Sequence, residues 1–206
     1  MIVWKYLFIA VAAYLMGCIS TGLLVAKNSG HDLRTEGSQN TGATNVLRVL
    51  GAKKGVLTFA GDFAKAMLAM LLGKWIGGQS GALIASLMVV IGHNWPVFHE
   101  FKGGKGVACS IAVMFLFFWQ GIIAGAVAIL VIWKTKYISA GSLTLLALFA
   151  ILLIITEPFW PVGVWALALA ALSFYRHRTN IQRLMNGTEN KLDFAKINKL
   201  SKKKSK

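Results

Sequence analysis

Residues 107–133 read VACSIAVMFLFFWQGIIAGAVAILVIW, a run of 27 residues without one charged side chain. A helix needs about 20 apolar residues to cross the hydrocarbon core of a bilayer, which is about 30 Å thick. The run can therefore form either one tilted helix of about 40 Å or two short helices that break near Gln120 and Gly121. Either arrangement indicates a protein that spans a membrane.

Further apolar segments lie on both sides of this run. They cover residues 6–26, 56–76, 81–98, 137–156 and 159–175. The apolar segment 56–76 contains Asp62 and Lys65, which lie one helical turn apart, so that their two charges can neutralise each other. Residues 6–26 lack a strongly basic start and a cleavage site, so we interpret them as an anchor and not as a signal peptide. The pattern predicts an all-α fold, a polytopic membrane helix bundle.

The composition fits this prediction and excludes several classes of protein. Hydrophobic residues are 56% and charged residues 14% of the 206 residues, whereas an ordinary soluble domain carries about 25% charged residues. A disordered polymer needs low hydrophobicity, and two cysteines are too few for a disulfide scaffold. Residues between the apolar runs carry nearly all of the net charge of +15, so we expect no nucleic-acid partner.

The positions of Lys and Arg choose between six and seven spans, because cytoplasmic segments carry an excess of these residues. Seven spans with the N-terminus outside place 19 of 22 basic residues inside, whereas six spans place 14 inside and 7 outside. We therefore predict seven transmembrane helices, two of them short, with a cytoplasmic C-terminus. Gly121 and Gly125 could let the second short helix pack closely, although chance explains the pair equally well in a chain with 21 glycines.

The chain should have two parts. Residues 1–191 form a membrane-embedded domain, and residues 192–206 form a basic cytoplasmic tail. Basic residues at this face attract anionic membrane lipids.

The first polar segment on the predicted cytoplasmic face, residues 37–48, reads GSQNTGATNVLR. Its glycines let backbone N–H groups point inward, and Arg48 supplies a planar fork suited to phosphate or carboxylate. Short side chains add hydrogen-bonding groups, namely Ser38, Asn40, Thr44 and Asn45. A turn before a helix capped by Thr44 or Asn45, with Arg48 in solvent, is an equally good interpretation.

The second segment, residues 92–106, reads GHNWPVFHEFKGGKG. Gly103, Gly104 and Lys105 precede a helix, so backbone donors, the helix dipole and the ammonium could bind an anion together. Gly106 stands where a Walker A loop has Ser or Thr. A flexible hinge is the structural alternative. His93 fits a satisfied polar core residue better than a metal ligand, and we predict no metal site.

The third segment, residues 175–189, reads YRHRTNIQRLMNGTE. A helix here would put His177 and Asn180 on one face. Its arginines can equally be positive-inside residues that reach lipid headgroups. Ser139 and Ser142 lie near the same membrane face. Together the segments offer many anion donors and almost no general base or nucleophile, which indicates a phosphate site beside a lipid.

Three patterns occur in order along the chain. They are Gly37-Ser38-x-Asn40-x-Gly42-Ala43-Thr44-Asn45-Val46-x-Arg48; then Gly92-His93-x-x-Pro96-Val97-Phe98 with Phe101-Lys102-Gly103-Gly104-Lys105-Gly106-Val107-Ala108; and Arg176-His177-Arg178-x-Asn180-Ile181-x-Arg183-Leu184-x-x-Gly187-x-Glu189. They closely resemble the three motifs of the bacterial acyl-phosphate:glycerol-3-phosphate acyltransferases. The match extends from the first span to about Lys191, and it departs at Gln39-Asn40-Thr41, where the family commonly has Gly-Asn-Pro.

The resemblance implies a seven-helix enzyme of the bacterial inner membrane with its active site at the cytoplasmic face. Such an enzyme moves a fatty acyl group from acyl phosphate to the 1-hydroxyl of glycerol 3-phosphate, giving lysophosphatidate and phosphate. No cofactor is implied, and we expect a monomer.

The resemblance also implies roles for single residues. It assigns catalytic roles to His177, Asn180 and Lys105. Substrate or phosphate binding falls on Ser38, Asn40, Thr44, Asn45, Arg48, His93, Gly103, Gly104 and Ser142. In the family picture the phosphate of glycerol 3-phosphate takes the hydroxyl proton, which agrees with the scarcity of bases and is preferred to His177 as the base.

Other functions fit the residues without the resemblance. A transporter of phosphate or an organic anion would place its polar positions near the midplane of two related halves, whereas these motifs cluster at one face. A membrane scaffold would depend on its polybasic tail. An acyltransferase that uses acyl-CoA or acyl carrier protein would carry a His-x-x-x-x-Asp pattern, which the chain lacks.

Overall fold

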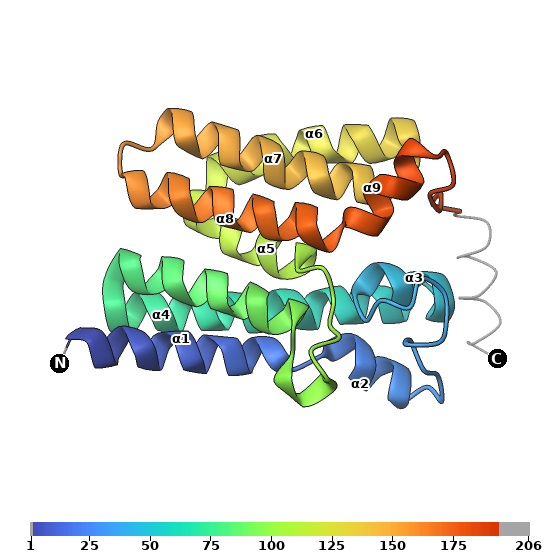
Figure 1. Ribbon diagram of the computed structural model, residues 1–206, viewed down its shortest axis with the longest axis horizontal. Helices are drawn as coiled ribbons and strands as arrows, with labels where there is room; N and C mark the ends of the chain where they lie inside the picture. The colour runs from blue at the N-terminus through green and yellow to red at the C-terminus, as the bar shows by residue number, and fades with distance from the viewer. Residues whose placement is uncertain (1, 194–206) are drawn as a thin grey trace. The chain divides into compact units, whose positions relative to one another are not determined.

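The computed structural model describes residues 2–193, and every regular element in that range is a helix (Figure 1). The predicted all-α class is confirmed for this part of the chain. The described residues divide into two compact units, residues 2–112 with residue 193, and residues 113–192.

The first unit contains two long helices that form its core. Its elements are α1 (Ile2–Cys18), α2 (Thr21–Lys27), α3 (Ala43–Leu50), α4 (Ala52–Asn94), the 3-10 turn η1 (Val97–His99) and α5 (Val107–Val113), which ends at the boundary. Within α4 the chain reverses at Gly78, whose φ of 62° and ψ of −149° are not helical. Only glycine adopts this conformation without strain. The reversal separates the two predicted spans at residues 56–76 and 81–98.

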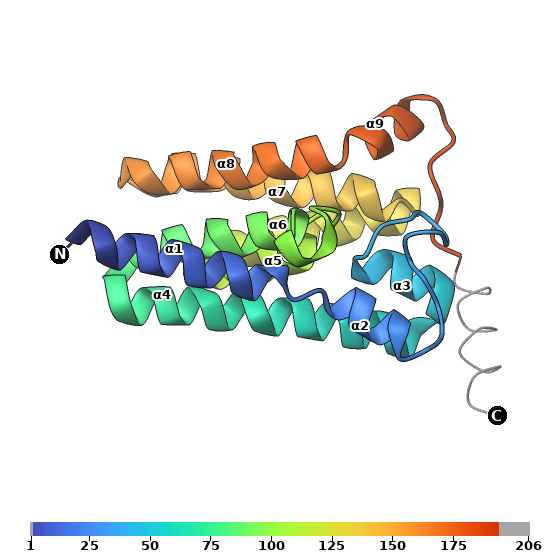
Figure 2. The same ribbon diagram turned by 60° about the horizontal axis from the view of Figure 1, so that its bottom comes forward.

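Helix α1 lies side by side with α4 (Figures 1 and 2). A Cβ on Gly17 would overlap the carbonyl oxygen of Val89, and a Cβ on Gly92 would overlap that of Tyr14. The tyrosine hydroxyl donates to the Trp95 carbonyl oxygen at 2.9 Å. Small residues thus let two membrane helices approach closely.

One long apolar segment is not a single helix. We expected one helix over residues 6–26, but α1 ends at Cys18 and α2 begins at Thr21. The Lys65 ammonium donates to the carbonyl oxygens of Gly17 and Ile19, at 3.0 and 2.5 Å. These bonds satisfy backbone acceptors that a break in the helix leaves open.

The second unit is built from three long helices. Its elements are the 3-10 turn η2 (Met114–Phe117), α6 (Phe118–Thr135), α7 (Ile138–Thr156), α8 (Trp160–Arg176) and α9 (Arg178–Met185). Phe149 and Leu146 of α7 are fully buried, and the Phe149 ring meets the Trp165 ring edge-on with centroids 6.2 Å apart.

The 27-residue apolar run is broken, but not near Gln120. The break falls at η2, where Phe117 has a φ of −133° and a ψ of 68°. Its ring packs against Trp165, with centroids 5.8 Å apart. The prediction of two short helices is therefore corrected: α5 has 7 residues, but α6 has 18, or about 27 Å. Gly121 lies against Met114, whereas Gly125 has nothing within 4 Å of a Cβ, so the pair forms no packing face.

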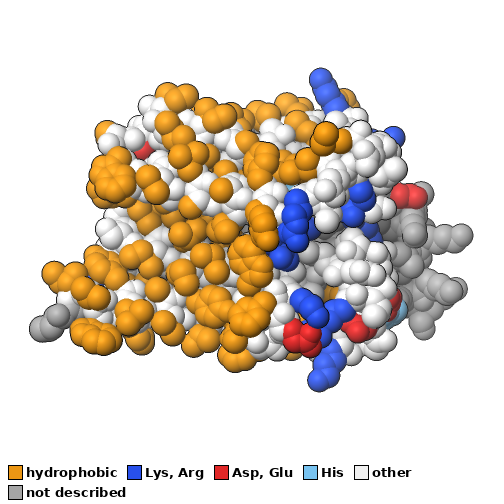
Figure 3. Space-filling model, viewed as in Figure 1, with side chains coloured by type: hydrophobic (Ala, Val, Ile, Leu, Met, Phe, Trp, Pro, Cys, Tyr) orange, Lys and Arg blue, Asp and Glu red, His pale blue; other side chains and the backbone are white. Residues whose placement is uncertain are grey.

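Four segments of the described chain are long and apolar enough to cross a membrane. They are Ile2–Lys27, Ala52–His99, Val107–Thr135 and Ile138–Thr156. Figure 3 shows hydrophobic side chains over much of the surface of the helices. Large apolar residues such as Trp75, Trp119 and Trp160 are 73–83% exposed, as expected where lipid replaces water around a protein.

Candidate active site

The first polar segment is a loop that one buried side chain closes from inside. Asn45, 1% exposed, accepts a hydrogen bond from the Ser38 N–H at 2.8 Å and donates to the Glu36 carbonyl oxygen at 3.0 Å. Gly37 has a φ of +63°, and a Cβ there would overlap the Asn45 side chain. The Asn45 carboxamide therefore fixes the loop in place and is committed to its backbone.

The start of α3 differs from the capped helix that we considered. Gly42 is the N-cap and supplies no side chain, while the Asn40 side chain accepts from the Gly42 N–H at 2.9 Å. The interpretation with Thr44 or Asn45 as the cap is wrong, because both residues already lie within the helix. Thr44 is half-buried, and so is Arg48 in the last turn. Arg48 is thus not a solvated surface arginine.

The loop rests on a small apolar core. Val46 and Leu50 of α3 pack with Ala26 and Leu33. This packing explains why α3 presents Asn45 toward the loop, since residues 45, 46 and 50 are all buried.

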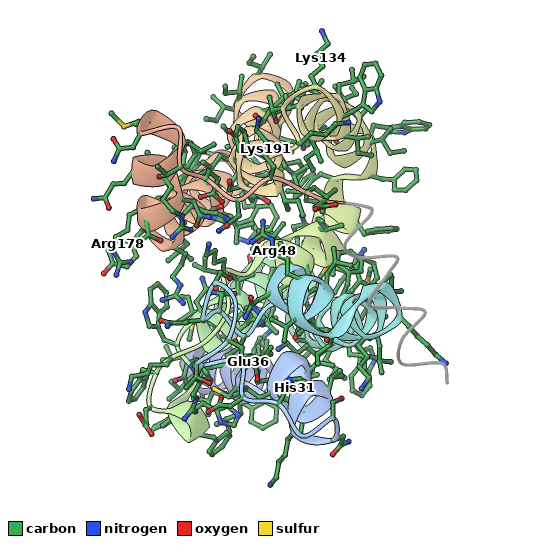
Figure 4. All side chains as sticks on the ribbon, turned by 90° about the vertical axis from the view of Figure 1, so that its right-hand side faces the viewer. His31, Glu36, Arg48, Lys134, Arg178 and Lys191 are labelled. Atoms are coloured by element: carbon green, nitrogen blue, oxygen red, sulfur yellow. The ribbon has the colours of Figure 1, made fainter. Side chains whose placement is uncertain are left out.

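Sequence reasoning missed a side-chain contact before this loop. His31 Nδ1 lies 3.0 Å from Glu36 Oε2, and Figure 4 shows the two side chains side by side. Nearby, the Arg34 guanidinium is 3.8 Å from the Glu100 carboxylate, which links this segment to the second polar loop. Neither His31 with Glu36 nor Arg34 with Glu100 has a spacing that predicts a contact from the sequence.

The second polar loop folds back onto the end of α4. The Gly104 N–H donates to the His93 carbonyl oxygen at 3.0 Å. A Cβ at Gly103 would overlap that oxygen, and one at Gly104 would overlap the His93 ring. Gly106, with a φ of +77°, leads into α5 and accepts from the Ser110 N–H at 2.7 Å. The glycines are thus required by close packing, and the half-buried Lys105 lies between them.

Asp62 and Lys65 form the predicted ion pair, with Lys65 Nζ 2.8 Å from Asp62 Oδ1. His93 joins them and is only 6% exposed, so it is the satisfied polar core residue that the sequence indicated. The described residues contain no group of three or more His, Cys, Asp or Glu side chains placed to hold a metal ion.

In the second unit, His177 stands between α8 and α9 and is 3% exposed. Its Nδ1 lies 2.8 Å from the Ser173 carbonyl oxygen, and 3.4 Å from the Ser173 hydroxyl. A carbonyl oxygen only accepts, so Nδ1 carries the proton. In a neutral ring Nε2 is then the nitrogen that can take up a proton.

Asn180, which is 4% exposed, belongs to a buried network around one carboxylate. Its amide donates to Glu189 Oε1 at 2.8 Å, and Arg183 Nε donates to Oε2 at 2.8 Å. The Ser139 hydroxyl also donates to Oε1, at 3.1 Å. Burial raises the pKa of the Glu189 carboxyl, but hydrogen bonds from Arg183 and Asn180 outweigh burial and leave this pKa below its ordinary value. The network holds an ionised carboxylate.

Sequence reasoning gave Glu189 no role, although it is the acid within the third polar segment. Ser142 lies one turn after Ser139 on α7, is 5% exposed and donates to the Ile138 carbonyl oxygen at 2.9 Å. The structure therefore brings Asn180 together with Ser139, through Glu189, while Ser142 bonds to its own helix. Arg178 points outward, as a headgroup-facing arginine would (Figure 4).

Comparisons with known proteins agree with these motifs. A sequence model of the family described as glycerol-3-phosphate acyltransferase matches residues 7–187. The chain is 47% identical over 185 residues to the glycerol-3-phosphate acyltransferase of Thermoanaerobacter sp. strain X514, covering 89% of this chain and 93% of that one. It is 41% identical over 201 residues to that of Aquifex aeolicus strain VF5, covering 91% and 99%.

The fold is similar to a solved structure. The crystal structure of PlsY (YgiH), an integral membrane glycerol 3-phosphate acyltransferase, in its glycerol 3-phosphate form, superimposes with a TM-score of 0.88 and 37% identity. The match covers 93% of this chain and 98% of that one. The chain is therefore an acyltransferase and belongs to the glycerol-3-phosphate acyltransferase family.

Proposed function

We propose that the chain transfers a fatty acyl group from acyl phosphate to the sn-1 hydroxyl of glycerol 3-phosphate, giving 1-acyl-sn-glycerol 3-phosphate and phosphate. Solved structures of PlsY are described as its glycerol 3-phosphate form and its lysophosphatidic acid form. These forms support glycerol 3-phosphate as the acceptor and lysophosphatidate as the product.

The observation that carries the choice of donor is the state of the buried carboxylates. Glu189 accepts hydrogen bonds from three side chains, and Asp62 is paired with Lys65. Neither carboxylate is placed to take a proton from a hydroxyl. A site without such a base suits an activated acyl donor such as an acyl phosphate, because this mixed anhydride already has a good leaving group; the choice of acyl phosphate among such donors follows from the three motifs.

The reaction then needs orientation and charge neutralisation more than base catalysis. The 1-hydroxyl oxygen attacks the acyl carbonyl carbon, the bond from that carbon to the phosphate oxygen breaks, and phosphate leaves. The hydroxyl proton passes to the phosphate of glycerol 3-phosphate, in preference to His177 Nε2. Binding in a fixed geometry and donors aimed at the developing oxyanion lower the barrier.

Each predicted site residue has a part in this scheme. Arg48 and Lys105 neutralise phosphate charge, and His177 with Asn180 position the polar substrate. The remaining residues donate hydrogen bonds from the loops or shape them, namely Ser38, Asn40, Thr44, Asn45, His93, Gly103, Gly104 and Ser142. Asn40, Asn45, His93 and Ser142 belong to the shaping group, because their side chains bond within the protein.

We propose seven spans for residues 1–191. Helix α1 with α2, the two limbs of α4, α5 continued by η2, and α6, α7 and α8 give this number, and α5 with η2 is the one short span. The excess of basic residues places the N-terminus outside and the motifs at the cytoplasmic face of the bacterial inner membrane. The basic tail, residues 192–206, lies almost wholly outside the described residues, and its proposed partner is anionic lipid.

The donor is tested by giving purified protein palmitoyl phosphate, palmitoyl-CoA or palmitoyl acyl carrier protein with glycerol 3-phosphate. We expect product from palmitoyl phosphate alone, with the ester at carbon 1 by proton NMR. Arg48→Ala and Lys105→Ala should reduce kcat/KM by about a hundredfold or more, as for lost charge-assisted contacts. Lys134→Ala, at an exposed lysine, is the matched control. Product from palmitoyl-CoA would contradict the proposed donor.

A further inference from the structure

Three ionisable side chains are buried together inside the first unit. Asp62 is 1% exposed, Lys65 8% and His93 6%, and all three belong to α4. Ionisable groups within a membrane span are costly and mark functional positions more often than structural ones. The proposed mechanism gives no role to Asp62 or Lys65.

The cluster joins segments that are far apart in the sequence. Lys65 Nζ lies 2.8 Å from Asp62 Oδ1 and 3.1 Å from His93 Nδ1, and it donates to two carbonyl oxygens at the end of α1. Asp62 Oδ1 is also 3.5 Å from His93 Nδ1. The Nδ1 edge of the imidazole therefore faces the ion pair, which fixes the rotation of the ring.

The opposite edge of the same ring supports the glycine loop. The nearest atom to a Cβ built on Gly104 is His93 Nε2, and the Gly104 N–H donates to the His93 carbonyl oxygen. The helix that follows the loop is held to the same place, because the Cys109 thiol lies 3.4 Å from the Asp62 carbonyl oxygen. Both ends of the segment that presents Lys105 are thus anchored beside the cluster.

Lys65 has a structural part, since it donates to the carbonyl oxygens of Gly17 and Ile19, but a purely structural tie would not need the imidazole beside the ion pair. Buried ion pairs are often replaced by apolar residues without loss of stability. Apolar packing, however, does not select one orientation of an imidazole, whereas a hydrogen bond to Nδ1 does.

We propose that Asp62, Lys65 and His93 act as positioning residues that set the backbone of Gly103 and Gly104 for a substrate phosphate. The ion pair orients the imidazole, and the imidazole holds the loop at the spacing that the phosphate oxygens require. The inference rests on the proposed function only in assigning this loop to a phosphate group. None of the three side chains is required to touch a substrate.

The test separates the two edges of the ring. His93→Asn keeps an amide near the position of Nδ1 but removes the tip that lies against Gly104, whereas His93→Gln reaches the position of Nε2. We expect His93→Asn to raise one KM, for glycerol 3-phosphate or for palmitoyl phosphate, by about tenfold with kcat changed by less than about threefold. His93→Gln should recover most of the loss. The KM that rises must be the one that rises in Lys105→Ala.

The ion pair is tested with a charge-neutral variant, because Lys65→Met alone leaves Asp62 buried without its partner and can prevent folding. Asp62→Asn combined with Lys65→Met should still fold, with a lowered Tm because the Gly17 and Ile19 carbonyl oxygens lose a donor, and should raise the same KM. Adding His93→Asn should then give no further rise, since the three groups act through one contact. Lys74→Met, at an exposed lysine of the same helix, should change nothing.

Binding of glycerol 3-phosphate and of inorganic phosphate is measured by calorimetry on the same variants, so the inference is tested even if acyl phosphate proves not to be the donor. We expect the Kd of at least one of these two ligands to rise about tenfold in His93→Asn and in the Asp62→Asn, Lys65→Met double variant. Unchanged Kd and KM values with a lowered Tm would show a merely structural cluster and overturn the inference. Additive effects, or a wild type that binds neither ligand, would overturn it as well.

Discussion

Replacing Glu189 by Gln should loosen the second unit without removing any side-chain atoms from it. The carboxylate accepts from Asn180 and Arg183 at 2.8 Å each and from Ser139 at 3.1 Å. A glutamine can still accept at one oxygen, from Asn180 and Ser139. Its amide nitrogen would face the Arg183 guanidinium, where two donors meet and neither is satisfied.

The size of the effect follows from the lost contact. A hydrogen bond to a charged group contributes about 1.5–3 kcal/mol. The Arg183 side chain is 34% exposed, so solvent screens part of that contribution, and we expect a loss of about 2 kcal/mol. For a chain of this size, 1 kcal/mol shifts Tm by about 2–4 °C, which gives an expected fall of about 4–8 °C.

The assay is thermal unfolding of the purified proteins in one detergent at neutral pH. Glu157→Gln is the matched control, since this residue of the same unit accepts one hydrogen bond, from the Gln120 side chain at 3.1 Å. It should shift Tm by less than about 2 °C. A Tm for Glu189→Gln equal to that of the control would refute the reasoning that the carboxylate holds this network together.

Three further results are expected from the same assay. The Tm difference between wild type and Glu189→Gln should shrink as the pH falls through the acid range, because a carboxyl with a lowered folded pKa stabilises above its unfolded pKa and loses that effect on protonation. Asn94→Leu should raise Tm by about 3–6 °C, since this side chain is fully buried and neither of its polar atoms has a hydrogen-bond partner within the described chain. Gly78→Ala should lower Tm by about 4–8 °C through backbone strain alone, as nothing lies within 4 Å of the added methyl, whereas Gly125→Ala, at an equally open helical position, should leave Tm unchanged or raised.

Features that depend on neighbouring residues could be predicted from the sequence. The helical class follows from long uncharged runs, and the reversal of α4 falls at Gly78, between two of the predicted spans. The ion pair of Asp62 and Lys65 follows from their separation by one helical turn. The close packing of the glycine loop against His93 was not predicted, because the glycines were interpreted as an anion site or a flexible hinge.

Features that depend on distant residues could not be predicted. The break after Cys18 leaves carbonyl groups that a lysine 46 and 48 residues further along satisfies, and no local pattern indicates this contact. The break in the long apolar run falls at Phe117, beside Trp165, and not at the glycine that local propensity favours. The Glu189 network likewise joins side chains up to 50 residues apart.

Formation of lysophosphatidate by the purified protein tests the central claim most directly. Labelled glycerol 3-phosphate and palmitoyl phosphate would be supplied in detergent with EDTA and without CoA. The amounts of lysophosphatidate and of phosphate formed would both be measured. The account predicts one lysophosphatidate for each phosphate released, with little product from Arg48→Ala or Lys105→Ala. Release of phosphate without lysophosphatidate, or no reaction at all, would contradict it.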